Sequence, residues 1–191
     1  MALEAVLFAS AEPVPLARLE AVFAPDGVEP ERVAEALETL RGACGGRGVE
    51  VQEVAGGFQL RTRSDLARWV ARLEIPKPVR FSRAALETLA VAAYRQPLTR
   101  AELEQVRGVD CGGVMKTLLE RGLLRIVGKK DVPGRPLLYG TARKFLETFG
   151  LSSLRELPTL RDLEEIVAER AEEVSSEADA GPAEGQSEDG G

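Results

Sequence analysis

A cluster of basic side chains, Lys129, Lys130 and Arg135, lies in a short stretch rich in glycine and proline. Guanidinium and ammonium groups bind carboxylates and phosphates, so this stretch can hold an acidic protein segment or a nucleic-acid backbone. A solvated turn that needs charge only to prevent edge-to-edge pairing would carry the same residues. Arg135 is the most informative of the three, because Gly134 and Pro136 on either side restrict the backbone and give the side chain a defined direction.

The apolar runs that flank the cluster, Leu123–Val127 and Leu137–Tyr139, predict two β-strands, so the basic stretch is expected to be the tip of a β-hairpin. Pro133 and Gly134 fit the central positions of a type II turn, since proline presets a negative φ and glycine accepts the positive φ that follows. We take six residues of this hairpin as the candidate partner-binding set: Arg125, Lys129, Lys130, Pro133, Arg135 and Tyr139.

The chain has the residues of no familiar catalytic, metal or nucleotide site. It contains no histidine, its two cysteines, Cys44 and Cys111, form no paired motif, and it has no phosphate-loop sequence. Acidic pairs such as Glu102 and Glu104 are typical of a solvated helix face. We therefore predict a protein that is not an enzyme and that uses no cofactor or metal. Free thiols and the lack of a long apolar run predict a cytoplasmic protein with no membrane contact.

The helices that must position the hairpin occur twice in the sequence. Residues 2–6 match residues 85–89, and residues 13–22 match residues 97–106. In each copy one helix ends near a proline, a second follows a turn, and a third leads into two short strands. Three helices followed by a hairpin are typical of the winged-helix variant of helix-turn-helix. The predicted fold is α+β and predominantly helical, with two tandem winged-helix domains.

Helical spacing assigns individual side chains to the core or the surface. Thr99 with Glu102 has the form of a capping box at the start of the second helix of copy two. Trp69, on a helix predicted over Leu66–Leu73, and Tyr94 are expected to be core or interface aromatics. The residues predicted to face the core of copy two are Leu86, Leu89, Ala90 and Ala93 in its first helix and Val114, Leu118 and Leu119 in its third.

The third helix of copy two is a poor reader of DNA bases. Its exposed positions are expected to be Gly112, Gly113, Lys116, Thr117 and Glu120. Its first two turns contain no arginine, asparagine or glutamine, the side chains best suited to base edges.

Charge divides the chain into three segments. Residues 1–75 carry a net charge of −4, residues 76–150 of +7 and residues 151–191 of −9. Two prolines, Pro76 and Pro78, separate the copies, and the predicted domains are residues 1–75 and 76–158, followed by an acidic segment over 159–191. Within that segment we expect a helix over Leu160–Val174 and a disordered tail from Ser175, because its composition offers nothing to bury.

Three longer motifs in copy two follow one another in a fixed order. They are Ala-Leu-Glu-Thr-Leu-Ala-Val-Ala-Ala-Tyr-Arg-Gln-Pro-Leu-Thr-Arg over 85–100, Leu-Leu-Glu-Arg-Gly-Leu over 118–123, and Val-Gly-Lys-Lys-Asp-Val-Pro-Gly-Arg-Pro-Leu-Leu-Tyr-Gly-Thr over 127–141. They closely resemble the bacterial segregation and condensation protein B family. The resemblance extends over residues 1–160 and is most specific over 82–154.

This resemblance implies a non-enzymatic accessory subunit of the bacterial condensin, an SMC ATPase complex that compacts and segregates chromosomes. Members of the family have two winged-helix domains, form homodimers largely through the N-terminal ones, and grip the central part of the kleisin, segregation and condensation protein A, with the C-terminal ones. For this chain the resemblance implies a cytoplasmic, nucleoid-associated homodimer that binds the kleisin and reaches the SMC ATPase through it.

A second hypothesis is a winged-helix DNA-binding regulator that lays the basic C-terminal domain directly on duplex DNA. The net charge of −6 argues against a free-standing DNA binder, and an aromatic content of 5% argues against single-strand binding. Direct DNA contact is therefore a secondary expectation. The two hypotheses differ in what Arg125, Lys129, Lys130 and Arg135 contact.

Overall fold

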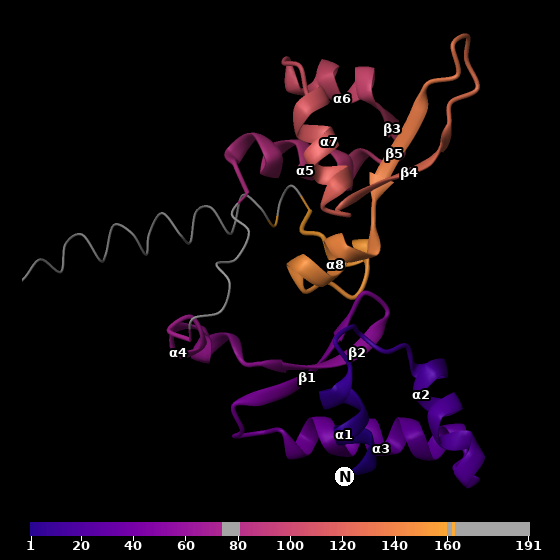
Figure 1. Ribbon diagram of the computed structural model, residues 1–191, viewed down its shortest axis with the longest axis vertical. Coiled ribbons are helices and arrows are strands. Elements are labelled where there is room, and N and C mark those ends of the chain that lie inside the picture. Colours follow the sequence, from indigo (N-terminus) through magenta and orange to yellow (C-terminus); the bar gives the residue numbers. More distant parts are fainter. Residues whose placement is uncertain (74–80, 160–161, 163–191) are drawn as a thin grey trace, which may run out of the picture. The chain divides into compact units, whose positions relative to one another are not determined.

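The computed structural model describes residues 1–73, 81–159 and 162 (Figure 1). These residues form helices together with one two-stranded and one three-stranded antiparallel sheet. The coarse prediction of a mixed, mainly helical α+β fold is confirmed. Apart from Asp162, the helix predicted over Leu160–Val174 and the disorder predicted from Ser175 lie outside the described residues.

Contacts group the chain into two units, Met1–Arg155 and Glu156–Gly191. The domain boundaries predicted near residues 75 and 158 therefore stay predictions.

Three helices followed by a hairpin make up the first half of the chain. They are α1 (Ala2–Ala9), α2 (Leu16–Phe23), α3 (Pro30–Ala43), β1 (Val49–Val54) and β2 (Gly57–Thr62), with the short helices η1 (Ala24–Asp26), η2 (Ser64–Leu66) and α4 (Ala67–Val70). Apolar side chains at helical spacing form one core, which includes Leu3, Leu7, Leu19, Val33, Leu37 and Val51. Fully burying such a side chain stabilises the fold by roughly 1.5–3 kcal/mol, so this cluster fixes the three helices against the hairpin.

The segment between α1 and α2 passes very close to the start of β2. The N–H of Val14 donates to the carbonyl oxygen of Phe58 at 2.9 Å, and the N–H of Phe58 donates to the carbonyl oxygen of Val14 at 2.8 Å. A Cβ on the neighbouring Gly57 would lie 2.8 Å from the carbonyl carbon of Val14. Only glycine lets the two backbones approach so closely.

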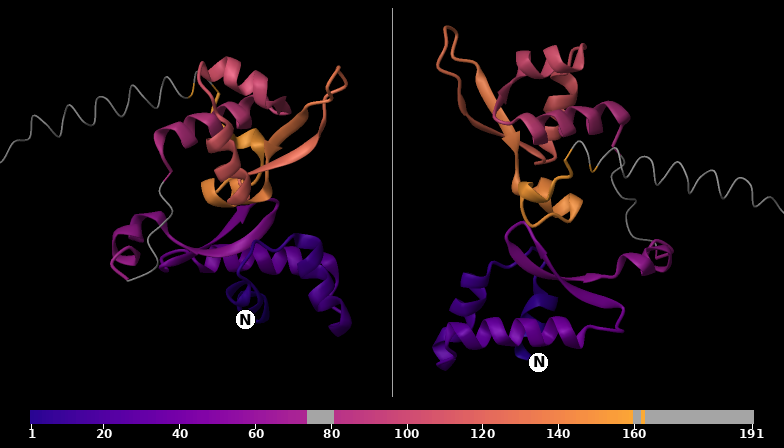
Figure 2. Two further views of the ribbon diagram at one scale, coloured as in Figure 1. Left: turned by 45° about the horizontal axis from the view of Figure 1, so that its top comes forward. Right: turned by 180° about the vertical axis from the view of Figure 1, so that it is seen from behind.

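The second half contains the elements that carry the candidate residues. They are α5 (Arg83–Arg95), β3 (Leu98–Thr99), α6 (Arg100–Arg107), α7 (Gly112–Glu120), β4 (Leu124–Lys129), β5 (Leu137–Thr141) and α8 (Arg143–Phe149), followed by η3 (Leu154–Glu156). The strands lie in the order β3-β5-β4, with β5 in the centre. The β4–β5 hairpin extends well beyond helices α5, α6 and α7 (Figure 2).

The predicted capping box at the start of α6 is confirmed. The N–H of Glu102 donates to the hydroxyl of Thr99 at 3.3 Å, and the Glu102 carboxylate accepts the N–H of Thr99 at 2.8 Å. At the other end, Gly108 adopts a φ of 69° and ends the helix in the left-handed conformation that glycine favours. Both ends of α6 are therefore set by local sequence.

The predicted core face of α5 is partly wrong. Leu86 and Ala90 are exposed, and the buried residues are Ala85, Thr88, Leu89, Ala92 and Ala93. The helix is turned by one position because Thr88 faces inward, where its hydroxyl accepts a hydrogen bond from the guanidinium of Arg107. The same guanidinium forms an ion pair of 2.7 Å with Glu87 and so ties α6 to α5.

The other assignments in this region are mixed. In α7, Leu118 is buried as predicted, Val114 and Leu119 are only half-buried, and Met115 is a buried residue that the prediction omitted. Helix α4 is much shorter than the predicted Leu66–Leu73. The core interpretation of the two aromatics is wrong, since Trp69 is 51% exposed and Tyr94 is also exposed. Their role at an interface stays a prediction.

Candidate partner-binding hairpin

Strand β5 ties the candidate hairpin into the fold, whereas β4 forms its outer edge. Tyr139 pairs with Leu98 of β3 on one side and with Ile126 of β4 on the other. Exposure increases across the sheet at this position: Leu98 is buried, Tyr139 is half-buried, and Ile126 is 52% exposed. A bulge at Val127 interrupts the register of β4, and this residue is also exposed. The hairpin thus presents aliphatic side chains along an open sheet edge, where an extended segment can dock.

The predicted type II turn is present at the tip. The N–H of Arg135 donates to the carbonyl oxygen of Val132 at 2.8 Å, and Gly134 adopts a φ of 83°. Arg135 itself has a φ of 40°, which is rare for a residue with a side chain. The N–H of Lys130 closes the loop by donating to the carbonyl oxygen of Pro136 at 2.8 Å. The tip therefore holds Arg135 on a restricted backbone.

Lys130 connects the hairpin to helix α6. Its ammonium group forms an ion pair with Glu102, the acidic member of the capping box, whose carboxylate also accepts hydrogen bonds from Thr99. The hydrogen bond from Lys130 and those from Thr99 lower the pKa of Glu102 to about 2. This carboxylate therefore has two roles, since it caps α6 and holds the base of the hairpin tip.

Replacing Glu102 with glutamine is expected to make the stability of the protein less dependent on pH in the acidic range. The ordinary pKa of Glu102 is 4.5 and its pKa in the folded protein is about 2. Its stabilising contribution is thus complete above about pH 4.5 and is lost as the pH falls toward 2. Urea unfolding of the wild type and of Glu102→Gln across this interval measures the difference.

Lys130→Met is the companion variant for this experiment. It keeps the carboxylate and removes the ammonium, so it should also reduce the loss of stability on acidification. If wild type and Glu102→Gln lose stability in parallel between these pH values, the assigned role of the carboxylate is wrong.

The six predicted partner-binding residues all lie on the β4–β5 hairpin or its tip, but they differ in what they can offer a partner. Lys129 and Arg135 are exposed and have no carboxylate partner among the described residues. Arg125 is exposed, although its Nε donates to the carbonyl oxygen of Thr141 at 3.2 Å. Lys130 is committed to Glu102. Pro133 shapes the exposed turn, and Tyr139 is half-buried in the central strand.

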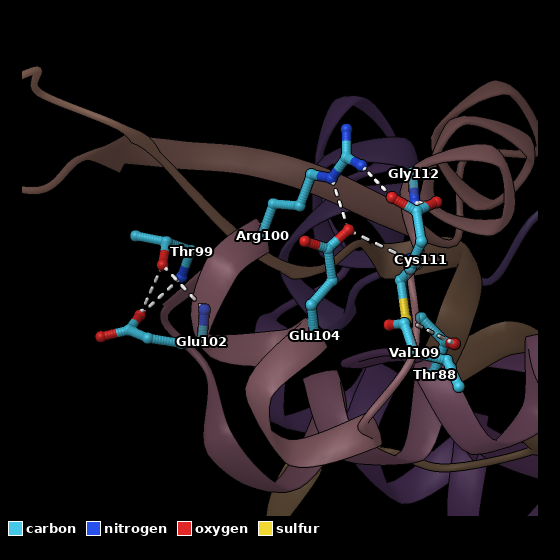
Figure 3. Close-up of polar contacts among 9 residues, drawn as sticks. Thr88, Thr99, Arg100, Glu102, Glu104, Val109, Cys111 and Gly112 are labelled. Carbon is cyan, nitrogen blue, oxygen red and sulfur yellow. Dashed lines mark hydrogen bonds and ion pairs between the residues drawn. The ribbon is translucent and has the colours of Figure 1, made fainter.

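The N-terminus of α7 is occupied by carboxylates of the chain itself (Figure 3). The N–H of Cys111 donates to Glu104 at 3.0 Å, and the N–H of Gly112 donates to Asp110 at 3.1 Å. Arg100 joins the two carboxylates, with distances of 2.6 Å to Glu104 and 2.5 Å to Asp110. A helix N-terminus is a common phosphate site, but here the N–H groups of Cys111 and Gly112 are already used and the adjoining carboxylates are negative.

The rest of α7 offers little to a nucleic acid. Lys116 lies 3.9 Å from the carboxylate of Glu120, and the hydroxyl of Thr117 donates to the carbonyl oxygen of Gly113 at 3.1 Å. Lys116 is the one cation of this helix, so the prediction that α7 is a poor base reader agrees with its geometry.

Comparison with known proteins gives the chain a family. Residues 1–160 match the family described as "Segregation and condensation complex subunit ScpB". The chain belongs to this family. The resemblance drawn from the sequence motifs is thereby confirmed, and the description is that of a subunit of a segregation and condensation complex.

Individual ScpB proteins match over most of the chain. Segregation and condensation protein B of Syntrophotalea carbinolica is 53% identical over 181 residues, which are 94% of this chain and 90% of that protein. The crystal structure of ScpB from Mycobacterium tuberculosis is 38% identical, covers 78% of this chain and 92% of that chain, and has a TM-score of 0.38. A solved dimer of an ScpB N-terminal domain complexed with an ScpA peptide is 26% identical, covers 41% and 90% of the two chains, and has a TM-score of 0.34.

Two site classes are not seen in the part of the chain that the structure describes. No group of three or more cysteine and acidic residues is arranged to hold a metal ion there. None of the helices in residues 1–73 and 81–159 is long and apolar enough to cross a membrane.

Sequence reasoning missed the aliphatic part of this hairpin. Ile126, Val127 and Val132 are exposed beside the basic residues, although the apolar run Leu123–Val127 had been read only as a strand. Which side of that strand meets solvent depends on the order β3-β5-β4, which joins segments far apart in the sequence. We use "hairpin surface" for the exposed set Arg125, Ile126, Val127, Lys129, Val132 and Arg135.

Proposed function

We propose that this ScpB-family chain is a non-enzymatic accessory subunit of a bacterial SMC condensin complex, a homodimer that holds the kleisin ScpA and supports chromosome condensation and segregation. We propose that a winged-helix domain over residues 1–75 forms the dimer and that a second one over residues 76–158 binds the kleisin. The SMC ATPase is reached through the kleisin, in the cytoplasm and at the nucleoid. No role is assigned to the acidic segment 159–191.

The hairpin surface is the single observation that carries the kleisin proposal. It combines exposed Lys129 and Arg135 with exposed Ile126 and Val127 on a backbone fixed by a hydrogen-bonded turn. Basic and aliphatic side chains together suit a protein segment that is both acidic and apolar. A phosphate backbone would contact the basic side chains but offers no apolar surface to the aliphatic ones. A rigid tip also loses less conformational entropy when a partner docks.

Co-purification of the full chain with ScpA tests this proposal. Native mass spectrometry of the mixture is expected to give two copies of the chain for each ScpA, and the chain alone is expected to be a dimer. The proposal would be contradicted if ScpA stayed unbound at micromolar concentrations. A dissociation constant in that range corresponds to a binding free energy of about −8 kcal/mol.

Direct binding of DNA by the basic segment is the second candidate function. Its support is the net charge of +7 over residues 76–150 together with exposed Lys129 and Arg135. If this candidate is right, the logarithm of the binding constant for duplex DNA should fall steeply and linearly with the logarithm of the salt concentration. The N-terminus of α7 counts against it, because Glu104 and Asp110 already accept hydrogen bonds from two of its N–H groups and their charge repels a phosphate.

A further inference from the structure

The turn between β1 and β2 donates its backbone N–H groups to a segment in the second half of the chain. Ala55 and Gly56 form this turn with φ values of 51° and 69°, the left-handed pair of a two-residue hairpin turn. The N–H groups at these two positions have no acceptor within such a hairpin. Here the N–H of Ala55 donates to the carbonyl oxygen of Leu151 at 2.8 Å, and the N–H of Gly56 donates to the carbonyl oxygen of Ser152 at 3.1 Å. Segments from the two halves therefore meet backbone to backbone.

Two arginines join the same halves in opposite directions. The guanidinium of Arg61 in β2 donates to the carbonyl oxygen of Glu147 at 3.0 Å, while its Nε donates to Gln59 at 3.1 Å. The guanidinium of Arg143 in α8 donates to the carbonyl oxygen of Pro13 at 2.7 Å. Glu147 lies in the last turn of α8, where a carbonyl oxygen lacks a partner within the helix and favours a cation. Hydrogen bonds from a charged donor are also stronger than neutral ones.

Extensive packing lies within each half of the chain. The core cluster that contains Leu3 and Val51 is built from residues of the first half alone. Among the described residues, the larger contacts between helices and strands all lie within residues 1–73 or within residues 81–155. Two compact bodies that meet through a small polar contact can move relative to each other once that contact breaks. The hydrogen bonds of the turn and of the two arginines therefore decide whether the halves stay together.

We propose that these four hydrogen bonds are a latch that holds the two halves of the chain in one arrangement, with Arg61 and Arg143 as its positioning residues. When the latch is closed, the hairpin surface keeps a fixed place relative to residues 1–73. When it opens, the halves separate and each keeps its own fold, because each half has its own sheet. The latch belongs to the chain by itself, so it does not depend on which partner the hairpin surface binds.

Amide hydrogen exchange of the full chain tests the latch without any substitution. The central N–H groups of a two-residue hairpin turn ordinarily face water and exchange fast. In the wild type, the amides of Ala55 and Gly56 are expected to exchange at least about 10-fold more slowly than in an unstructured peptide, as measured by NMR. Exchange of both amides at the rate of an unstructured peptide would overturn the latch.

Arg61→Ala/Arg143→Ala should open the latch from both sides. Loss of the two charged donors is expected to make the amides of Ala55 and Gly56 exchange at least about 10-fold faster than in the wild type. The amides paired between β1 and β2 should stay protected, because that ladder lies within the first half. If exchange at the turn did not change, the arginines would not hold the halves together and the proposal would be wrong.

The matched control is Arg41→Ala/Arg47→Ala, which removes the same charge. The ion pairs of these arginines, with Glu38 and Glu4, lie within the first half. This variant should keep the wild-type exchange rates at the turn. Equal acceleration in the two variants would also overturn the proposal, because the effect would then follow from charge and not from the contacts between the halves.

Spin labels give an independent measurement of the arrangement. Cys44 and Cys111 are buried, so cysteines introduced at exposed Ala17 on α2 and exposed Lys116 on α7 take the labels. Labelled chains are diluted with unlabelled ones, so that each distance is measured within one chain. Double electron–electron resonance should give one narrow distance distribution in the wild-type background and a broad one with the two arginines replaced. A broad distribution in the wild-type background would contradict a closed latch.

Discussion

Reversing the charge of Lys129 and Arg135 together, as Lys129→Glu/Arg135→Glu, is expected to weaken binding of ScpA by about 100-fold. Both side chains are exposed on the hairpin surface and have no carboxylate partner among the described residues. Each substitution turns an attraction for an acidic segment into a repulsion. Each should therefore weaken the binding free energy by about 1–2 kcal/mol at the exposed edge of the interface. Isothermal titration of ScpA into the wild type and the variant measures the change.

The fold should tolerate this double variant. Neither side chain makes a contact that holds the hairpin, and glutamate accepts the positive φ at position 135 no worse than arginine does. Lys130 is left unchanged for the opposite reason. Its ion pair with Glu102 joins the tip to α6, so a loss of binding in a Lys130 variant would mix a lost contact with a displaced hairpin.

The matched control is Lys116→Glu/Lys144→Glu, which changes the net charge equally on exposed residues of α7 and α8, away from the hairpin. It should keep the wild-type affinity for ScpA. Duplex DNA is titrated in parallel at a stated ionic strength near 0.15 M, because binding to phosphates depends strongly on salt. If the hairpin variant loses DNA and keeps ScpA, the hairpin is a nucleic-acid surface and the kleisin assignment is wrong.

The features that sequence predicted well are those that neighbouring residues determine. The turn at Pro133 and Gly134 and the capping box of Thr99 with Glu102 each form within four residues, so residue type and spacing suffice to specify them. The basic composition of the hairpin was equally visible, because it needs no knowledge of what the chain folds against.

The features that sequence missed depend on residues far apart along the chain. The core residues predicted for α5 did not include Thr88, but Arg107 from another helix satisfies its hydroxyl and lets it face the core, which turns α5 by one position. Lys130 was predicted to bind a partner or to lie on a solvated turn, although it is paired with Glu102, which lies 28 residues earlier. Ile126 belongs to an apolar run that predicted only a strand, and its exposure follows from the place of that strand at the edge of the sheet.

Gly57→Ala is expected to lower the free energy of unfolding by about 2–3 kcal/mol, the largest stability effect that we predict for a change of one methyl group. The new Cβ would lie 2.8 Å from the carbonyl carbon of Val14, which is backbone and cannot swing aside like the end of a side chain. Relief of the clash moves the α1–α2 segment off β2 and lengthens the two hydrogen bonds between Val14 and Phe58. Urea unfolding followed by circular dichroism measures the loss.

Gly42→Ala is the control that isolates the clash from the general effect of replacing glycine. Gly42 lies in α3, and a Cβ there meets nothing within 4 Å, so alanine should leave the stability unchanged or raise it by up to about 1 kcal/mol through its better helix propensity. Equal stabilities for the two variants would show that the segment can move away at no cost and that the contact does not constrain the fold.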